Sequence, residues 1–163
     1  MSALALVIAV SLSSSPAPRR LPPAGETAKL YFLAGDLAKA VERASRGVKS
    51  DPKVCRPMLK ALAEYGAMAN HSDEFTPEQA RDFIKWDRQI SPSAPGKLTQ
   101  PVIDRFVTAP LARASQLAET DVVAARDLVE RVLLVDPKSP DALTLQKLVR
   151  GVTTSTGSEG RFK

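Results

Sequence analysis

The residues best suited to acid–base, nucleophilic or metal chemistry are few in this 163-residue chain and lie far apart. The single histidine, His71, stands in a polar stretch without a second ligand or a nucleophile, so we interpret it as a solvated turn residue. The single cysteine, Cys55, stands at the entrance to an apolar helix, where a free thiol is typically inert packing. The acidic residues Asp73, Glu74 and Glu78 lack the spacing and central glycine of a calcium loop. We therefore predict no catalytic site, metal or cofactor, and we do not expect an enzyme.

Basic residues are unevenly distributed, and they point to binding rather than to catalysis. Residues 39–60 contain seven basic residues against two acidic ones. Spacings of four and seven place Lys39, Arg43 and Arg46 on one helix face, and Lys49 follows them in the same segment. One interpretation is a basic patch that binds an acidic peptide, a carboxyl terminus or lipid head groups. The net charge of +5 favours acidic partners but is too small for us to expect nucleic acid.

A second interpretation of these charges involves no ligand. Residues 64–87 are acidic, with Asp87 at their end, so the basic and acidic segments would be ordinary solvated faces that complement one another when helices stack. Trp86 is the best candidate for an exposed aromatic contact, because it lies off the predicted apolar stripe of its helix. The helical spacing of Tyr31, Tyr65 and Phe83 favours core packing for these rings.

Two predicted helices joined by a tight turn position the basic patch. Residues 26–34 form the first, with an apolar face of Leu30, Tyr31, Leu33 and Ala34. Gly35 is predicted to end this helix, and Asp36 to cap the next one. The second helix ends at Asp51, because Pro52 disfavours helical geometry in the residue before it. Its buried stripe is Leu37, Ala40, Val41, Ala44 and Val48.

The remaining chain predicts further helices of the same kind. One begins at Pro57 and runs to Ala69, and the next begins with a capping box at Thr76–Gln79. A helical pattern over 101–118 is interrupted by Pro110, which predicts a kink near Thr108 and Ala109. Two more helices open at Asp121 and at Ser139-Pro140, and the last one is predicted to stop at Gly151. Their apolar stripes are Ala125, Leu128, Val129, Val132 and Val135, then Leu143, Leu145, Leu148 and Val149.

The chain also repeats itself weakly. An offset of 85 residues aligns Asp36 with Asp121, Ala40 with Ala125 and Pro52 with Pro137, and the middle hairpin fits through Ala80, Ile84 and Pro92. Residues 26–150 resemble the tetratricopeptide repeat family at Tyr31, Gly35, Ala40, Ala44, Gly47 and Pro52. Intervals of 40 and 45 residues separate Ala40, Ala80 and Ala125, where that family has about 34, and its tryptophan and second-helix aromatic residue are missing.

The resemblance implies an all-α fold of α-hairpin repeats, a tetratricopeptide-like solenoid of about three hairpins plus a C-terminal capping helix. It also implies a non-catalytic scaffold or adaptor that binds a protein or peptide, and the basic patch would favour an acidic one. The composition is similar to repeat regions that sit beside a membrane segment in bacterial envelope and signalling proteins. The alternative function is therefore a membrane-tethered accessory repeat region of a larger protein of that kind, truncated at Met1.

The N-terminal segment bears on localisation. Residues 3–12 form an apolar run too short for a bilayer span of roughly 20 residues, and residues 16–25 form a proline-rich linker. Three explanations fit: a secretory signal with a small-residue cleavage region, a truncated membrane helix, or an uncleaved apolar start of a cytosolic chain. The cell envelope is slightly favoured, with membrane association through residues 3–12. We thus divide the chain into a signal-like segment and linker (1–25), a repeat domain (26–150) and a disordered tail (151–163).

Overall fold

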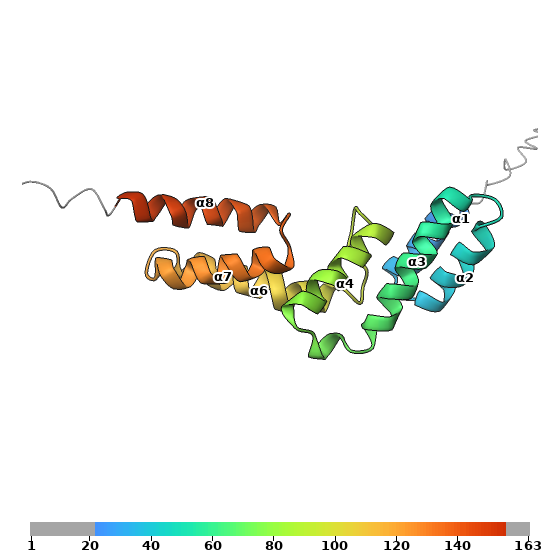
Figure 1. Cartoon of the computed structure of the whole chain (residues 1–163), viewed down its shortest axis with the longest axis horizontal. Coiled ribbons are helices and arrows are strands. Elements are labelled where there is room, and N and C mark those ends of the chain that lie inside the picture. Colours follow the sequence, from blue (N-terminus) through green and yellow to red (C-terminus); the bar gives the residue numbers. More distant parts are fainter. Residues whose placement is uncertain (1–21, 156–163) are drawn as a thin grey trace, which may run out of the picture.

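All regular structure in the described part of the chain is helical. The computed structural model describes the backbone of residues 22–155 and the side chains of residues 22–151, so the apolar run 3–12 and tail residues 156–163 lie outside the described residues. The helices form an elongated row, with α1–α3 at one end, α4 in the middle and α6–α8 at the other end (Figure 1). The elements are α1 (Ala24–Leu33), α2 (Leu37–Gly47), α3 (Pro52–Ala69), the 3₁₀ turn η1 (Ser72–Glu74), α4 (Pro77–Ile90), α5 (Gln100–Ile103), the π-helix η2 (Asp104–Thr108), α6 (Ala109–Leu117), α7 (Val122–Val135) and α8 (Pro140–Ser155).

Packing mainly follows the order of the chain. Helices α1 to α4 each pack on the next, and α6, α7 and α8 do the same, while α4 packs on α7 across the middle of the row. The prediction of an all-α chain built from stacked neighbouring helices is therefore confirmed. Each helix buries one stripe against its neighbours, as expected for a helical-repeat arrangement.

The turn between α1 and α2 has the predicted chemistry. Gly35 has a φ of 84°, which glycine adopts without a Cβ penalty, and its N–H donates to the carbonyl of Phe32. Asp36 caps α2 by accepting from the Lys39 N–H at 3.1 Å. These two residues fix the close antiparallel approach of α1 and α2.

The predicted apolar face of α1 is wrong by part of a turn. Leu30 is 59% exposed and Tyr31 is 37% exposed, whereas Ala28 and Phe32 are buried. The spacing of four between Ala28 and Phe32 defines the true stripe, because the large Phe32 ring gains more from burial than its neighbours. In α2, Ala40 and Ala44 are buried as predicted, but Val41 is 39% exposed. This hairpin therefore shows solvent more apolar surface than the sequence predicted.

Helix α3 begins earlier than predicted. Asp51 is its N-cap and accepts from the Val54 N–H at 3.3 Å, and Pro52 is its first residue. The Asp-Pro pair thus starts a helix as well as ending the preceding turn, and Pro57 lies inside the helix rather than at its start. The earlier start places Cys55 in the buried stripe of α3.

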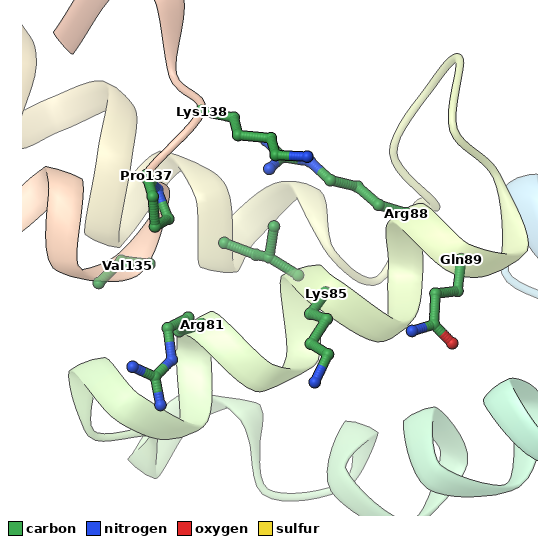
Figure 2. A pocket seen from close by; sticks show the side chains of 8 residues that line it. Arg81, Lys85, Arg88, Gln89, Val135, Pro137 and Lys138 are labelled. Atoms are coloured by element: carbon green, nitrogen blue, oxygen red, sulfur yellow. The ribbon is translucent and has the colours of Figure 1, made fainter. Parts of the chain in front are cut away.

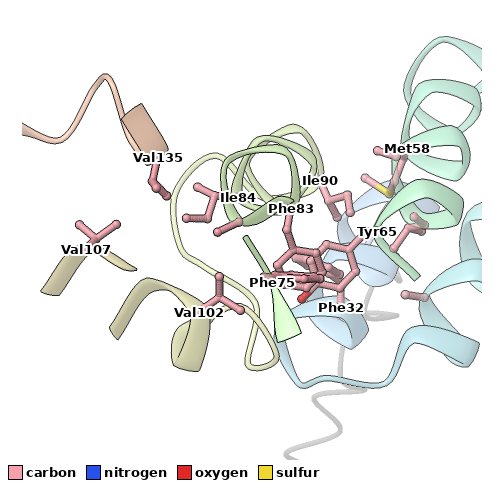
Figure 3. Packing of buried hydrophobic residues seen from close by; sticks show 14 of the residues in the cluster. Phe32, Met58, Tyr65, Phe75, Phe83, Ile84, Ile90, Val102, Val107 and Val135 are labelled. Atoms are coloured by element: carbon pink, nitrogen blue, oxygen red, sulfur yellow. The ribbon is translucent and has the colours of Figure 1, made fainter. Parts of the chain in front are cut away.

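Aromatic rings form the centre of the largest core cluster. The Thr76–Gln79 capping box is present at the start of α4 and points Phe83 at Tyr65 of α3. The rings of Tyr65 and Phe83 stack at 4.2 Å between centroids, and Phe32 and Phe75 meet them edge-on at 4.9 and 5.2 Å (Figure 3). This cluster joins α1, α3 and α4 in one core.

A buried polar network attaches the loop 91–99 to this core. Asp87, at 2% exposure, accepts through Oδ1 from the Gly96 N–H at 2.8 Å and the Thr99 hydroxyl at 2.6 Å. Because the Thr99 proton is used in that bond, the Tyr65 hydroxyl donates to Thr99 at 2.8 Å. The Lys97 N–H also donates to the carbonyl of Leu33, at the end of α1. The placement of Asp87 on a solvated acidic face is therefore wrong.

Pro110 disturbs its helix where predicted. The backbone forms a π-helix over η2, and the Ala109 N–H donates to the carbonyl of Asp104, five residues back. A wider turn accommodates a proline that cannot donate to the carbonyl four residues before it. Regular α-helix resumes at Ala109.

Helix α7 shares two local features with α2. Asp121 caps α7 by accepting from the Ala124 N–H at 3.0 Å, as Asp36 does in α2, and the aligned residues Ala40 and Ala125 are both fully buried. Helix α8 does not stop at Gly151 as predicted but continues to Ser155. Gly151 lacks the positive φ that would end a helix there. In α8, Val149 is buried, whereas Leu143 and Leu148 are 39% and 56% exposed.

Candidate partner-binding sites

The predicted basic patch forms a shallow hollow on the outer side of the first hairpin. Lys39, Arg43 and Arg46 line it together, so their predicted common face is confirmed. The hollow has a volume of about 360 Å³, and its wall on the α1 side includes the exposed residues Leu30 and Tyr31. We call it the α1–α2 hollow. Lys49, which is exposed, does not line it.

Charges in the α1–α2 hollow are largely paired. The Lys39 ammonium lies 2.7 Å from the Asp36 carboxylate, and Arg46 forms an ion pair with Glu42. The side-chain hydrogen bond from Lys39 lowers the pKa of Asp36 and raises that of Lys39. Arg43 is different, because its Nε is buried without a hydrogen-bond partner among the described residues. Among the three basic residues of the hollow, Arg43 is thus the one without a carboxylate partner in the described part of the chain.

Trp86 lies on α4, away from this hollow, and is only partly exposed. Its ring packs against the core cluster, and the Lys85 ammonium lies 5.6 Å from the ring centroid. Trp86 is thus less exposed than predicted for an aromatic contact residue, because part of its ring packs against the core. As the single tryptophan of the chain, Trp86 still reports on the α4 surface beside it.

A second basic site lies where α4 meets the end of α7, and sequence reasoning missed it. Arg81, Lys85 and Arg88 follow one another at spacings of four and three along α4, and Lys138 comes from the turn after α7. The four basic residues enclose a cleft of about 380 Å³, which we call the α4–α7 cleft. Figure 2 shows Arg88 and Lys138 along one side of it and Arg81 and Lys85 along the other. Its apolar floor is formed by Ile84, Val135 and Pro137.

An ion pair holds the two sides of the α4–α7 cleft together. Arg88 donates from Nη1 and Nη2 to the two carboxylate oxygens of Asp136, at 2.7 and 2.6 Å. The Asp136 side chain is only 8% exposed, and the hydrogen bond to Asp136 raises the pKa of Arg88. This two-point contact fixes the orientation of α4 against the α7 end, because it constrains the guanidinium in its plane. The only sequence signal for the cleft was the helical spacing of the three α4 cations.

Two further residues that the sequence singled out for possible chemistry, Cys55 and His71, lie outside both basic sites. Cys55 is fully buried, and burial raises the pKa of its thiol, which lowers its reactivity. His71 is exposed in the loop before η1. Within residues 22–155, no group of three or more His, Cys, Asp or Glu side chains is placed to hold a metal ion. None of the helices in the same part of the chain is both long and apolar enough to cross a membrane.

Comparison with known proteins gives no match for this chain, whether to a protein-family model, to a curated protein or to a solved structure.

Proposed function

We propose that this protein is a non-catalytic scaffold or adaptor, a tetratricopeptide-like helical-repeat protein that binds acidic segments of other proteins. The observation that carries the proposal is the α1–α2 hollow, where three basic side chains converge beside an exposed leucine and tyrosine. Basic groups next to apolar surface are what an acidic peptide needs, since the cations provide specificity and the apolar contacts provide affinity.

Arg43 is the residue in the hollow that a partner would engage first. Lys39 and Arg46 already have carboxylate partners, so a ligand that contacted only them would compete with Asp36 and Glu42. Arg43 forms no ion pair with a carboxylate among the described residues, so a ligand carboxylate that reached its guanidinium would displace no partner. Leu30 and Tyr31 lie on the same wall and would contact the ligand's aliphatic groups.

The test is a selection of binding peptides from a random display library against the full chain, followed by measured affinities. Selected peptides should be rich in Asp and Glu and should bind the Arg43→Glu/Arg46→Glu variant at least about tenfold more weakly. The matched control is Lys53→Glu/Lys60→Glu, which makes the same charge change at exposed positions of α3 outside the hollow. An equal loss of affinity in both variants would show that only the net charge matters. Unchanged binding by Arg43→Glu/Arg46→Glu would refute the basic patch.

A second candidate rests on the apolar run 3–12 ahead of the proline-rich linker. In this proposal the helices are a membrane-tethered accessory region of a larger bacterial signalling or envelope protein. An in-frame extension upstream of Met1 that lengthens the apolar run would support it, and so would recovery of the chain in the membrane fraction. Sequencing the N-terminus of the mature protein would separate it from export with cleavage, because a cleaved signal leaves a new first residue.

A further inference from the structure

We propose that the α4–α7 cleft is a second binding site, which takes an acidic peptide segment with an aliphatic side chain between its carboxylates. The inference rests on the proposed scaffold function and assigns it a different place on the molecule. The arrangement of charge around an apolar floor is what identifies the ligand.

The rims of the cleft carry positive charge that the protein itself does not neutralise. Of its cations, Arg88 is paired with Asp136. Arg81 forms a long ion pair with the neighbouring Asp82, with 3.8 Å between Nε and the carboxylate, which is beyond hydrogen-bonding distance. Among the described residues, Lys85 and Lys138 form no ion pair, and no carboxylate lines the cleft. Lys85 and Lys138 thus remain available to a ligand, while Arg81 is held only by its long ion pair with Asp82.

The unpaired positive charges lie on both rims of the cleft. The side chain of Lys138 extends toward Arg88 on one rim, while Arg81 and Lys85 lie on the opposite rim with their charged ends directed away from Val135 and Pro137 (Figure 2). Two like-charged groups on one rim repel each other, and Asp136 compensates only one of them. An anion bound beside Lys138 would remove that repulsion. A ligand that spans the cleft therefore needs negative charge at both of its edges.

The aliphatic floor between the rims favours a ligand with an apolar side chain at its centre. Ile84 and Val135 are 2% and 3% exposed, so only small parts of their side chains face the cleft, and Pro137 completes an aliphatic surface. A volume of about 380 Å³ lies at the lower end of the range for ligand sites. It suits a leucine-sized side chain with the carboxylates on either side of it.

These features favour a peptide over the other anions that basic sites bind. No aromatic ring lines the cleft, so nucleic-acid bases would have nothing to stack on. A free phosphate would leave the aliphatic floor uncovered. A planar bilayer would reach the exposed rims but not the apolar floor between them. An acidic peptide uses both rims and the floor.

Trp86 provides the readout in the unmodified full chain. Because the Lys85 ammonium lies over the indole ring, a carboxylate that binds Lys85 should change the emission of the only tryptophan. The probes are a peptide containing Glu-Leu-Glu-Glu, its Gln-Leu-Gln-Gln and Glu-Ser-Glu-Glu counterparts, inorganic phosphate, and vesicles of phosphatidylcholine with phosphatidylserine. We expect saturable binding of Glu-Leu-Glu-Glu, with each counterpart peptide at least about fivefold weaker.

The variants separate this cleft from the α1–α2 hollow. Arg81→Glu/Lys85→Glu should weaken binding of the Glu-Leu-Glu-Glu peptide by about tenfold or more. The variant loses two exposed charge pairs with the peptide and replaces each attraction with a repulsion. Backbone amide shifts on titration provide a second measurement and should concentrate on α4 and the end of α7. If the charge reversal unfolds the chain, Lys85→Gln/Lys138→Gln removes two charges without adding repulsion and should still weaken binding. Arg88 is left unchanged, because it holds the cleft together through Asp136.

Each other outcome has a definite meaning. Binding that is lost in Arg43→Glu/Arg46→Glu but kept in Arg81→Glu/Lys85→Glu would overturn the cleft and leave the scaffold function standing. Failure of the peptide to bind anywhere on the chain would overturn the cleft, while the peptide selection decides the scaffold function separately. Equal displacement of the peptide by phosphate, or stronger binding to the vesicles, would assign the cleft to a phosphate or a lipid head group and overturn the peptide.

Discussion

The buried carboxylate of Asp87 makes the sharpest prediction about stability. Its Oδ1 alone accepts both the Gly96 N–H and the Thr99 hydroxyl, in a site where Asp87 is 2% exposed. Asp87→Ala leaves two buried donors without a partner, and we expect it to lower the free energy of unfolding by about 2–4 kcal/mol. Asp87→Asn keeps an oxygen in place for both donors and removes the buried charge. We expect it to cost less than about 1 kcal/mol at neutral pH.

The same two variants give a pH test with a definite sign. Burial raises the pKa of Asp87 above its ordinary value of 3.8, although the hydrogen bonds from Thr99 and Gly96 oppose this. A raised pKa in the folded state means that the neutral form stabilises the protein fully below pH 3.8 and that this contribution is lost as pH rises through the folded-state pKa. The stability of wild type relative to Asp87→Asn should therefore fall as pH rises through that window. Comparison with the variant cancels the titration of other groups.

The assay is urea unfolding followed by Trp86 fluorescence at a series of pH values, with the slope of each transition compared between variants. An Asp87→Asn variant as unstable as Asp87→Ala at neutral pH would refute the hydrogen-bond account. A stability difference between wild type and Asp87→Asn that does not change with pH would refute the burial account. The two arguments can thus fail separately.

Two further predictions concern backbone positions. Gly47→Ala should destabilise the chain by about 1–3 kcal/mol, because its Cβ would lie 2.5 Å from Cys55 Sγ and 2.6 Å from Ala24 Cβ. The control Gly66→Ala meets nothing within 4 Å and should stabilise α3 by about 0.5–1 kcal/mol in the same thermal unfolding assay. Asp36→Ala and Asp121→Ala should each lower the midpoint of thermal unfolding, while the Asn replacements, which retain a capping oxygen, should not. Stability unchanged by loss of either aspartate would contradict the equivalence of the two caps.

Local signals in the sequence predicted local structure well. The caps at Asp36, Thr76 and Asp121, the turn at Gly35 and the disturbance before Pro110 all follow from backbone chemistry within a few residues, and all are present. The burial of Asp87 was not predicted, although the sequence contained an indication of it. It lies three residues after Ile84 on the buried stripe of α4, so its register predicted burial while its charge suggested solvent.

Other predictions were wrong because one sequence pattern is compatible with two local structures. Asp51-Pro52 was predicted to end the second helix, but α2 already ends at Gly47 and the pair instead caps and starts α3. In α1 two apolar stripes compete, and the choice between them is made by Phe32 packing against Tyr65 of another helix. Tertiary contacts of this kind cannot be read from one segment.

The candidate sites show the same limit. The common face of Lys39, Arg43 and Arg46 could be predicted because it depends on the period of one helix. The α4–α7 cleft could not, because Arg88 and Asp136 are 48 residues apart in sequence and only the packing of α4 on α7 brings them together. Contacts between residues far apart in the sequence can be identified only from the three-dimensional structure and not from the sequence pattern of one helix.

The attachment of loop 91–99 to α1, α3 and α4 also has a consequence for how the chain unfolds. A linear array, in which each unit contacts only its neighbours, opens from its ends one unit at a time. Here Lys97 bonds to the end of α1 and Thr99 bonds to Tyr65, so α1 cannot fray without breaking contacts made from beyond α4. We expect the slowest-exchanging amide hydrogens in α1 to α4 to share one free energy of opening, because these helices open cooperatively. Amides in α8, at the open end of the row, should exchange faster.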